Sequence, residues 1–377
     1  MKKHPGFMCA LAGLLMLLGG IVVSTNALAE SSAGIAKEAI PVIYVNHAAT
    51  GTGDGLSWAN ACTTITQGVN AVPDSGGQAW IAQGAYAEAV TLENNIQLYG
   101  GFSGSETNRE ERNWTIHPTI IDGNNINRCV TVKTDALVDG FTLQNGQAEY
   151  GGGMYHGTAS HCIFRKNNAF NGGGIFYGTA FDCIFSGNTA REGSGSWIST
   201  VTNCVFTGNI AETGGAVSGG KAVNCTISCN QAHLVGGMMA GEAINCIIWG
   251  NSIEIDDNVE ISFSCLSVAV AGEGNIVAVP KFVNPAKGDF RLQSDSPCIN
   301  VGASVAAPVM DILGRTRPNG ADIDMGAYEY YTGDDVDAIS SPPVLYVNAA
   351  SSAETPDGLR WGSAFTTLQK AADKAGY

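Results

Sequence analysis

The chain has 377 residues, of which 45% are hydrophobic and only 14% are charged, and its formal net charge is −15. A negative balance of this size argues against nucleic acid and acidic membrane surfaces as partners. The length is sufficient to bury a long core, and the 49 glycines favour a fold with many tight turns.

The first 29 residues have the pattern of a secretory signal peptide. Two lysines precede an apolar run at residues 7–23, and Ala27-Leu28-Ala29 offers a small-residue cleavage site. The alternative is an uncleaved membrane anchor, against which the short run and the cleavage site argue. No other segment is apolar for long enough to span a bilayer. We therefore expect an exported protein, extracellular or at the outer membrane or cell surface, with no transmembrane span in the mature chain.

After a leader at residues 30–41, residues 42–78 are predicted to form an N-terminal cap. The segment 42–45 alternates like a β-strand, and Asp54-Gly55 marks a turn. Apolar residues then recur at helical spacing, which predicts an amphipathic helix that covers the otherwise open end of a stacked fold. The residues at this spacing are Trp58, Ala61, Cys62, Ile65, Val69 and Val72.

Short strand-like runs follow at residues 79–82, 90–92 and 96–99. Residues 103–118 carry charges and are expected to project as a loop, which is where repeat folds usually place a binding surface.

Between residues 141 and 251 one pattern recurs every 21 residues. Each repeat has a cysteine, an apolar residue two positions later and an asparagine five positions later, and glycine clusters separate the repeats. The cysteines are Cys162, Cys183, Cys204, Cys225 and Cys246, and the asparagines are Asn167, Asn188, Asn209, Asn230 and Asn251.

A repeat of this length cannot bury a core alone and must stack on its neighbours. Each cysteine and the apolar residue two positions later share one face of a strand, so both are predicted to point inward. The asparagines, at a bend, are predicted to form a ladder of amide hydrogen bonds. Neighbouring coils are about 4.8 Å apart, farther than the Cβ separation of about 3.8 Å in a disulfide, so we interpret the cysteines as buried thiols rather than disulfides or metal ligands. The predicted fold is all-β, a parallel β-helix with right-handed connections and about 21-residue coils.

Several motifs resemble known families. FRKN at 164–167, FSGN at 185–188 and FTGN at 206–209 resemble the FxxN repeats of polymorphic outer-membrane proteins, and the glycine clusters resemble their GGA[ILV] repeats. SPCINVG at 296–302 and DIDMGAYEY at 322–330 resemble the closing motifs of β-helix proteins of the choice-of-anchor Q type. More broadly, the pattern is similar to right-handed parallel β-helices of the pectate-lyase type. The resemblance implies such a β-helix, with its closing motif, over residues 79–330.

The end of the sequence repeats its beginning. Residues 331–343 are rich in Asp, Ser and Pro and are predicted to be a linker. Within residues 344–377, LYVN at 345–348 and the DGL that follows match IYVN at 43–46 and its own DGL. We interpret this segment as the start of a second, truncated β-helix domain.

The repeats offer few residues for catalysis or for metal binding. Asp182 follows His161 by one period, and a His beside an Asp can act as an acid/base dyad. We favour the alternative, a polar ladder in which Asp182 accepts a hydrogen bond from His161. No catalytic residue is therefore assigned, although these two remain candidates. The acidic run at 254–260 could bind calcium but lacks alternating ligand spacing, so no metal or other cofactor is expected.

Two further columns are candidates for binding. Tyr155, Phe176 and Trp197 recur every 21 residues and would stack on sugar rings if exposed, or belong to the core if they point inward. A second column is β-branched and points outward. We favour strand propensity on a solvent face as its explanation, with cover by a loop or a partner as the alternative. Its members are Ile163, Ile184, Val205, Thr226 and Ile247.

These observations support two hypotheses about function. The favoured one is an exported, non-catalytic scaffold whose β-helix is structural, adhesive or carbohydrate-binding, with a polysaccharide or cell-surface ligand as partner. The alternative is a polysaccharide lyase or glycoside hydrolase that acts on acidic polysaccharides, which requires carboxylates to converge on one outer face.

Overall fold

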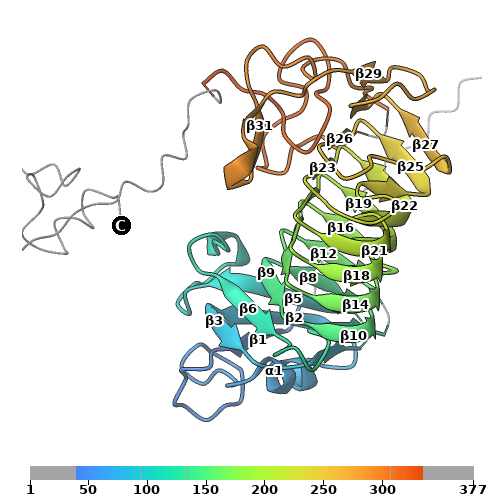
Figure 1. Ribbon diagram of the computed structural model, residues 1–377. Helices are drawn as coiled ribbons and strands as arrows, with labels where there is room; N and C mark the ends of the chain where they lie inside the picture. The colour runs from blue at the N-terminus through green and yellow to red at the C-terminus, as the bar shows by residue number, and fades with distance from the viewer. Residues whose placement is uncertain (1–39, 94, 134, 306, 334–377) are drawn as a thin grey trace, which may run out of the picture. The chain divides into compact units, whose positions relative to one another are not determined.

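The computed structural model describes residues 40–93, 95–133, 135–305 and 307–333. The predicted signal peptide, nearly all of the leader, most of the linker and the second β-helix lie outside these residues. In the described part, short strands pair in parallel from one coil to the next (Figure 1). The prediction of an all-β, parallel β-solenoid is confirmed.

The longest sheet contains 15 strands among the described residues. They are β1 (Val42–Val45), β2 (Gly77–Ala82), β4 (Val90–Leu92), β5 (Ile96–Phe102), β7 (Val130–Val132), β8 (Leu137–Asp139), β11 (Met154–Tyr155), β12 (Thr158–Ser160), β15 (Ile175–Phe176), β16 (Thr179–Phe181), β19 (Ser196–Thr202), β22 (Val217–Val223), β24 (Met238–Met239), β25 (Gly241–Ile244) and β27 (Val259–Ser262). We call it the long sheet.

Two further parallel sheets complete the coils. The second sheet consists of β3 (Gly84–Tyr86), β6 (Thr119–Asp122), β9 (Phe141–Gln144), β13 (Ile163–Arg165), β17 (Ile184–Ser186), β20 (Val205–Thr207), β23 (Thr226–Ser228), β26 (Ile247–Trp249), β28 (Cys265–Leu266) and β29 (Ile276–Val277). The short sheet consists of β10 (Gln147–Tyr150), β14 (Asn168–Asn171), β18 (Thr189–Glu192) and β21 (Ile210–Gly214).

The register between neighbouring coils follows the 21-residue period of the sequence. Phe164 in β13 pairs with Phe185 in β17, and Phe185 pairs with Phe206 in β20. Because the register matches the period, each side chain meets its counterpart in the next coil. The early coils depart from this rule: Leu98 in β5 pairs with Val138 in β8, since the chain between them includes the 103–118 loop with its 3-10 helix η1 (Arg109–Glu111).

Two inward columns fill the core of the regular coils. The rings of Phe164, Phe185 and Phe206 are fully buried and stacked, with centroids 4.6 and 4.5 Å apart. The five repeat cysteines are buried beside them, and all ten cysteines of the described residues are free thiols. The column therefore consists of small buried side chains rather than covalent links.

The repeat asparagines form a buried ladder of hydrogen bonds. The amide of Asn188 donates to the carbonyl of Phe164 and to Oδ1 of Asn209, both at 2.9 Å. Its own Oδ1 accepts from the backbone N–H and the side-chain amide of Asn167, at 3.1 and 3.0 Å. The same pattern recurs at Asn209 and Asn230. Each asparagine thus uses its donor and acceptor groups to tie three consecutive coils.

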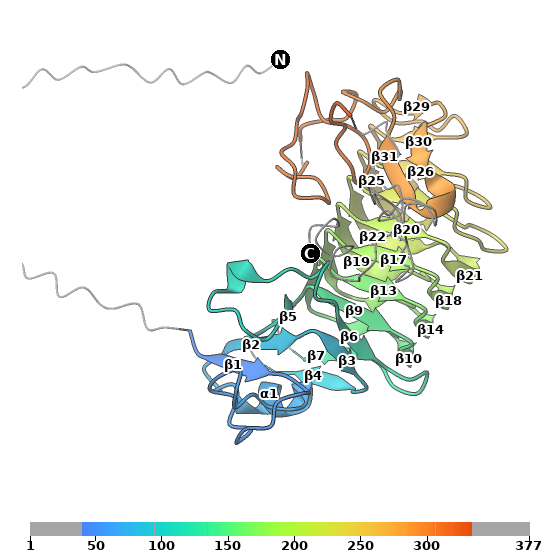
Figure 2. The same cartoon turned by 90° about the vertical axis from the view of Figure 1, so that its left-hand side faces the viewer.

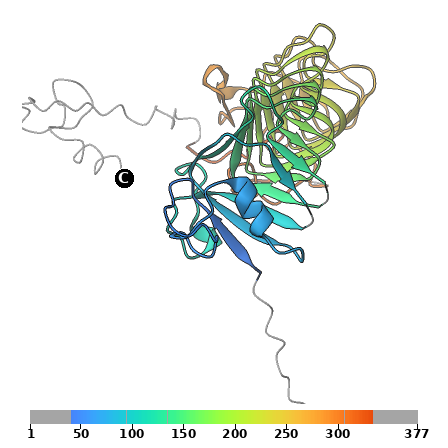
Figure 3. The ribbon, with the colours of Figure 1, turned by 90° about the horizontal axis from the view of Figure 1, so that it is seen from below.

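The helix α1 (Ile65–Ala71) lies against β1, β2 and β4 at one end of the solenoid (Figure 3). Thr64 caps it by accepting a hydrogen bond from the backbone of Gln67, and the carboxylate of Glu88 accepts two more backbone N–H groups of the first turn. The helix is shorter than predicted, because Cys62 pairs with β1 as an isolated bridge. Within the described residues, no helix is long and apolar enough to cross a membrane.

Residues 282–331, which we call the closing segment, pack on the outer face of the second sheet (Figure 2). This segment begins with the antiparallel pair β30 (Phe282–Asn284) and β31 (Asp289–Leu292), which flank the 3-10 helix η2 (Pro285–Lys287). Phe290 and Met325 of the segment share a buried cluster with Val205 and Ile247. The interpretation of the outward β-branched column as a solvent face is therefore wrong at these positions, whereas Ile163 and Ile184, in earlier coils, remain partly exposed.

Candidate functional site

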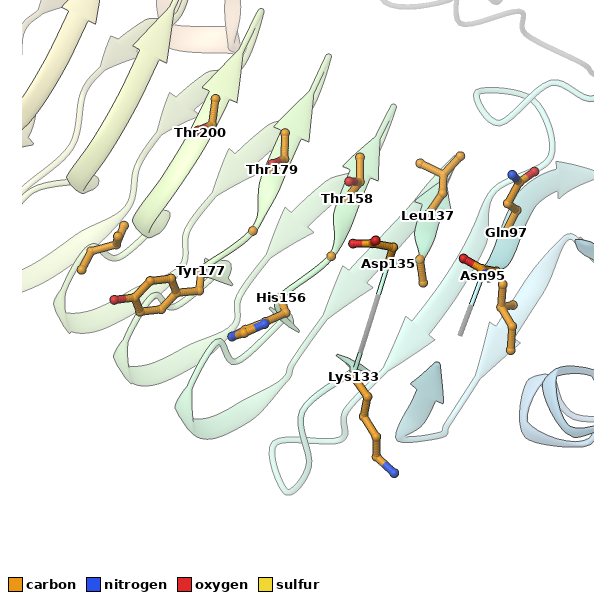
Figure 4. Close-up of a pocket in the computed structure, with 15 residues that line it drawn as sticks. Asn95, Gln97, Lys133, Asp135, Leu137, His156, Thr158, Tyr177, Thr179 and Thr200 are labelled. Atoms are coloured by element: carbon orange, nitrogen blue, oxygen red, sulfur yellow. The ribbon is translucent and has the colours of Figure 1, made fainter. Parts of the chain in front are cut away.

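A groove of about 900 Å³ runs along the outside of the long sheet, across several coils (Figure 4). One side is a row of threonines, Thr158, Thr179 and Thr200, which pair in register from coil to coil. The other side is a row formed by His156, Tyr177 and Ile198. Both rows follow the 21-residue period. The first presents a threonine on three successive coils, whereas the second presents an imidazole, a phenol and an aliphatic side chain.

The second row owes its position to a bend in each coil, which lies between two strands at His156 and Tyr177 and within β19 at Ile198. His156, Tyr177 and Ile198 have φ angles of 61°, 54° and 44°, in the left-handed region that turns the chain sharply. Tyr177 is 50% exposed and Ile198 is 38% exposed. Sequence reasoning missed this row, because it marked the preceding residue of each coil as the aromatic column.

The rings of the predicted aromatic column stack on one another and do not line the groove. Tyr155 and Phe176 stack with centroids 5.5 Å apart, and Phe176 and Trp197 stack at 4.7 Å. The guanidinium of Arg128 covers Tyr155, with Cζ 4.9 Å from the ring centroid, and Phe176 is only 6% exposed. The rings therefore stabilise one another, and among these aromatic residues the neighbouring Tyr177 is the one that reaches the groove.

A smaller cleft of about 460 Å³ lies above the outer face of the second sheet. Its walls are residues 112–115 of the charged loop and residues 312–314 of the closing segment, and its floor includes Ile163 and Ile184. His161 and Asp182 line it as well. The charged loop at 103–118 thus forms one wall of this cleft, and the expectation that it carries a binding surface stays a prediction.

Asp139 is the principal partner of His161 in this cleft. The Nδ1 atom of His161 lies 3.2 Å from Oδ1 of Asp139 and 2.9 Å from Oγ of Ser160. The same carboxylate oxygen lies 2.9 Å from Nη2 of Arg112. The ring of Trp114 packs on the imidazole, with centroids 4.4 Å apart. In the tautomer that carries the proton on Nδ1, His161 donates toward Ser160 Oγ and Asp139, and Nε2 faces Asp182.

The predicted hydrogen bond from His161 to Asp182 is wrong. Nε2 of His161 lies 3.9 Å from Oδ2 of Asp182, beyond hydrogen-bonding distance. Asp182 instead accepts a hydrogen bond of 3.0 Å from the amide of Asn203. Both His161 and Asp182 sit at bends with positive φ, of 49° and 53°, so their backbones place them at one corner of successive coils.

The two aspartates of the cleft have pKa values shifted in opposite directions. Burial raises the pKa of Asp139, but the hydrogen bond from His161 and the charge of Arg112 outweigh it, so the pKa lies below its usual value. Burial raises the pKa of Asp182, and the hydrogen bond from Asn203 and the nearby His161 only partly offset it. Environments that separate two carboxyl pKa values are typical of acid/base sites, although ion-pair networks produce them too.

The lowered pKa of Asp139 predicts a pH-dependent contribution to stability. A carboxyl whose pKa is depressed in the folded state stabilises it above the unfolded value of about 3.9, and this contribution is lost as the pH falls through the folded value. We expect Asp139→Asn to lower the free energy of unfolding by about 2 kcal/mol near pH 7 and by less near pH 3. Urea unfolding at both pH values measures this, with the exposed Asp257→Asn as control. A difference that stays constant with pH would contradict the assignment.

Two residues of the acidic run, Glu254 and Asp256, accept hydrogen bonds from protein groups. Glu254 is buried, and its carboxylate accepts from the backbone of Gly250, the amide of Asn251 and the hydroxyl of Ser267. Asp256 accepts from the backbone of Ala240. In the described part of the chain, no group of three or more His, Cys, Asp or Glu side chains is placed to hold a metal ion.

The fold of this chain is similar to that of a solved protein structure. No family model matches the chain, and no curated protein matches it. The crystal structure of pectate lyase Pel9A is similar over 77% of this chain and 96% of that chain, at 14% sequence identity and a TM-score of 0.43. The fold assignment rests on the strand pairing of this chain itself, and the likeness to polymorphic outer-membrane and choice-of-anchor Q proteins stays a resemblance.

Proposed function

We propose that this protein is an exported, non-catalytic scaffold that binds a linear polysaccharide outside the cell or at its surface. The groove on the long sheet is the observation that carries the proposal. It crosses several coils, and its threonine row repeats the same hydroxyl on three of them, which suits a polymer of repeating units. The signal-peptide pattern at residues 1–29 supports export.

The groove offers the two kinds of group that recognise sugars. The threonine row supplies hydroxyls, which both donate and accept hydrogen bonds, and Gln97 adds an amide. The exposed ring of Tyr177 supplies an apolar face with a polar tip. Because these groups sit on paired strands rather than on a long loop, they are held in place before a ligand binds, which reduces the entropic cost of binding.

Native electrophoresis of the full chain through gels that contain linear polysaccharides tests this proposal. We expect at least one polysaccharide to slow the chain, and we expect Thr158→Val with Thr179→Val to relieve the retardation. The control is Thr189→Val with Thr207→Val, which alters partly exposed threonines on the other two sheets. The proposal fails if no polysaccharide retards the chain, or if both double variants behave alike.

Polysaccharide cleavage at the smaller cleft is a second candidate function. The observation that favours it is the arrangement of His161 between Asp139 and Asp182, whose pKa values are shifted apart. A histidine oriented through Nδ1 can use Nε2 as a base, and a carboxyl with a raised pKa can supply a proton.

Depolymerisation of pectic, alginate and glycosaminoglycan substrates, with and without calcium, tests this second candidate. If the cleft is catalytic, His161→Ala reduces the rate by about a hundredfold or more, whereas His233→Ala, at an exposed histidine that lines neither the cleft nor the groove, leaves it unchanged. Absence of cleavage, or cleavage that survives His161→Ala, would exclude the cleft as an active site.

A further inference from the structure

The charges of the groove indicate which class of polysaccharide it takes. Among the described residues that line it, Lys133 and Asp135 are the residues with a permanent formal charge at neutral pH, and His156 is the remaining titratable base. Nζ of Lys133 lies 2.6 Å from Oε1 of Glu93, so its positive charge is already offset. No arginine lies in the described lining, although sites for carboxylated or sulfated ligands commonly rely on arginine.

We infer that the groove binds an uncharged, linear polysaccharide that lies along the stacking direction of the coils. This inference rests on the proposed function and narrows its ligand. A polyuronate would bring one negative charge with each sugar and would meet the carboxylate of Asp135, whereas the single lysine of the described lining is already paired with Glu93. An uncharged glycan avoids this repulsion and can still hydrogen-bond to the threonine hydroxyls and pack against the ring of Tyr177.

The direction of the ligand follows from the register of the threonine row. Thr158 pairs with Thr179, and Thr179 pairs with Thr200, so equivalent hydroxyls recur at about 4.8 Å along the stack. A glycan that lies along this direction meets a threonine on three successive coils, and Leu137 and Gln97 at the equivalent positions of the two coils before them. A glycan that lies across the coils would meet one threonine and then leave the groove.

The rings of the second row give the ligand its apolar contact. The rings of His156 and Tyr177 lie on successive coils with centroids 5.9 Å apart, and Ile198 continues the row on the next coil. Aromatic faces favour the C–H surface of uncharged sugar rings through apolar burial, which does not depend on salt. Hydroxyl groups on one side of the groove and apolar groups on the other therefore suit a ribbon-like chain with one polar edge.

Isothermal titration of the full chain with defined oligosaccharides tests the inference. The uncharged probes are oligomers of β-1,4-linked xylose, mannose and glucose, and the acidic probes are oligogalacturonate and oligoalginate. We expect at least one uncharged probe to bind about tenfold more tightly than either acidic probe, a gap of about 1.4 kcal/mol. We also expect its affinity to change little between about 50 and 500 mM NaCl.

Three variants test whether the uncharged probe binds in the groove. Tyr177→Ala should weaken binding of the uncharged probe about tenfold. Phe170→Ala, on the short sheet, should not, although Phe170 is similarly exposed, at 47% against 50%. Lys133→Gln should leave the affinity unchanged.

Three results would contradict the inference in distinguishable ways. Stronger, salt-sensitive binding of an acidic probe that is lost in Lys133→Gln would overturn the uncharged ligand and leave polysaccharide binding intact. Equal losses in Tyr177→Ala and Phe170→Ala would show that the groove is not the site. Failure of every probe would overturn the proposed function itself.

Discussion

Asn188→Ala is expected to destabilise the fold by about 3–5 kcal/mol, because each buried polar group left without a partner costs about 1–3 kcal/mol. The side chain of Asn188 is fully buried and takes part in four hydrogen bonds. Its removal leaves two N–H groups of Asn167 without their acceptor and takes one donor from the carbonyl of Phe164 and one from Oδ1 of Asn209, which still accepts from the backbone N–H of residue 188. The small cavity that alanine leaves is flanked by coils on both sides, so these groups cannot turn to solvent without opening the stack.

Urea unfolding followed by circular dichroism measures the loss. The matched control is Asn168→Ala, which removes an exposed asparagine of the same coil region and is expected to change the free energy of unfolding by less than about 0.5 kcal/mol. Asn188→Asp provides a second comparison, since it keeps the acceptor and loses the amide donors. If Asn188→Ala and Asn168→Ala unfold at the same urea concentration, the ladder does not stabilise the solenoid as described.

The asparagine ladder could be predicted because both features that produce it, the spacing and the residue type, are visible in the sequence. The 21-residue period fixes the register, and an amide carries both the donor and the acceptor that a column of identical residues needs. The same logic placed the cysteines and the phenylalanines inside. Each of these positions depends on its counterpart one coil away, and the period identifies that counterpart without knowledge of the rest of the fold.

The two hollows could not be predicted in the same way. The groove depends on Tyr177 and its neighbours, whose exposure is decided by a left-handed bend between two short strands, and no regular spacing of apolar residues marks that bend. Asp139 precedes the regular cysteine series, and its contact with His161 depends on how the irregular early coils pair with the later ones. The repeat pattern therefore indicated Asp182 as the partner of His161 and did not indicate Asp139, which lies closer.

The closing segment shows a further limit of local patterns. The β-branched column of Val205 and Ile247 reads as a solvent-facing strand pattern until residues far along the chain cover it. Hydrogen bonds join the closing segment to the solenoid. Among them, Ala327 donates its backbone N–H to Oγ1 of Thr226, and the side-chain amide of Asn224 donates to the carbonyl of Asp324. These hydrogen bonds join residues about a hundred positions apart in sequence. No periodic pattern connects such positions, so the contact could not be predicted from the repeat.

Replacement of Arg317 is expected to release the closing segment from the solenoid. Arg317 is 4% exposed and lies at the centre of the segment. Its Nη1 donates to the carbonyl of Asp324 at 3.0 Å and lies 3.4 Å from Oε2 of the buried Glu329, and its Nη2 donates to Asn203 of the solenoid. Loss of one partner of a buried ion pair costs about 3–5 kcal/mol, because the other charge stays buried without compensation.

Amide hydrogen exchange distinguishes local release from global unfolding. In Arg317→Ala we expect faster exchange across residues 309–329 while the strands of the regular coils keep their protection, because the backbone N–H groups of these strands donate between coils and not to the segment. Arg191→Ala, in which an exposed arginine is lost from above the ring of Phe170, is the control and should leave exchange unchanged. Unchanged protection of 309–329 in Arg317→Ala would show that apolar packing alone holds the segment.

The same variant separates the two hollows functionally. Residues 312–314 form one wall of the cleft over His161, whereas the groove on the long sheet has no lining residue from the closing segment among the described residues. Release of the segment should therefore remove any activity or binding that belongs to the cleft and leave binding of a polysaccharide in the groove intact. If Arg317→Ala also abolishes polysaccharide binding although the coils remain protected from exchange, the ligand contacts the closing segment and the groove is not its whole site.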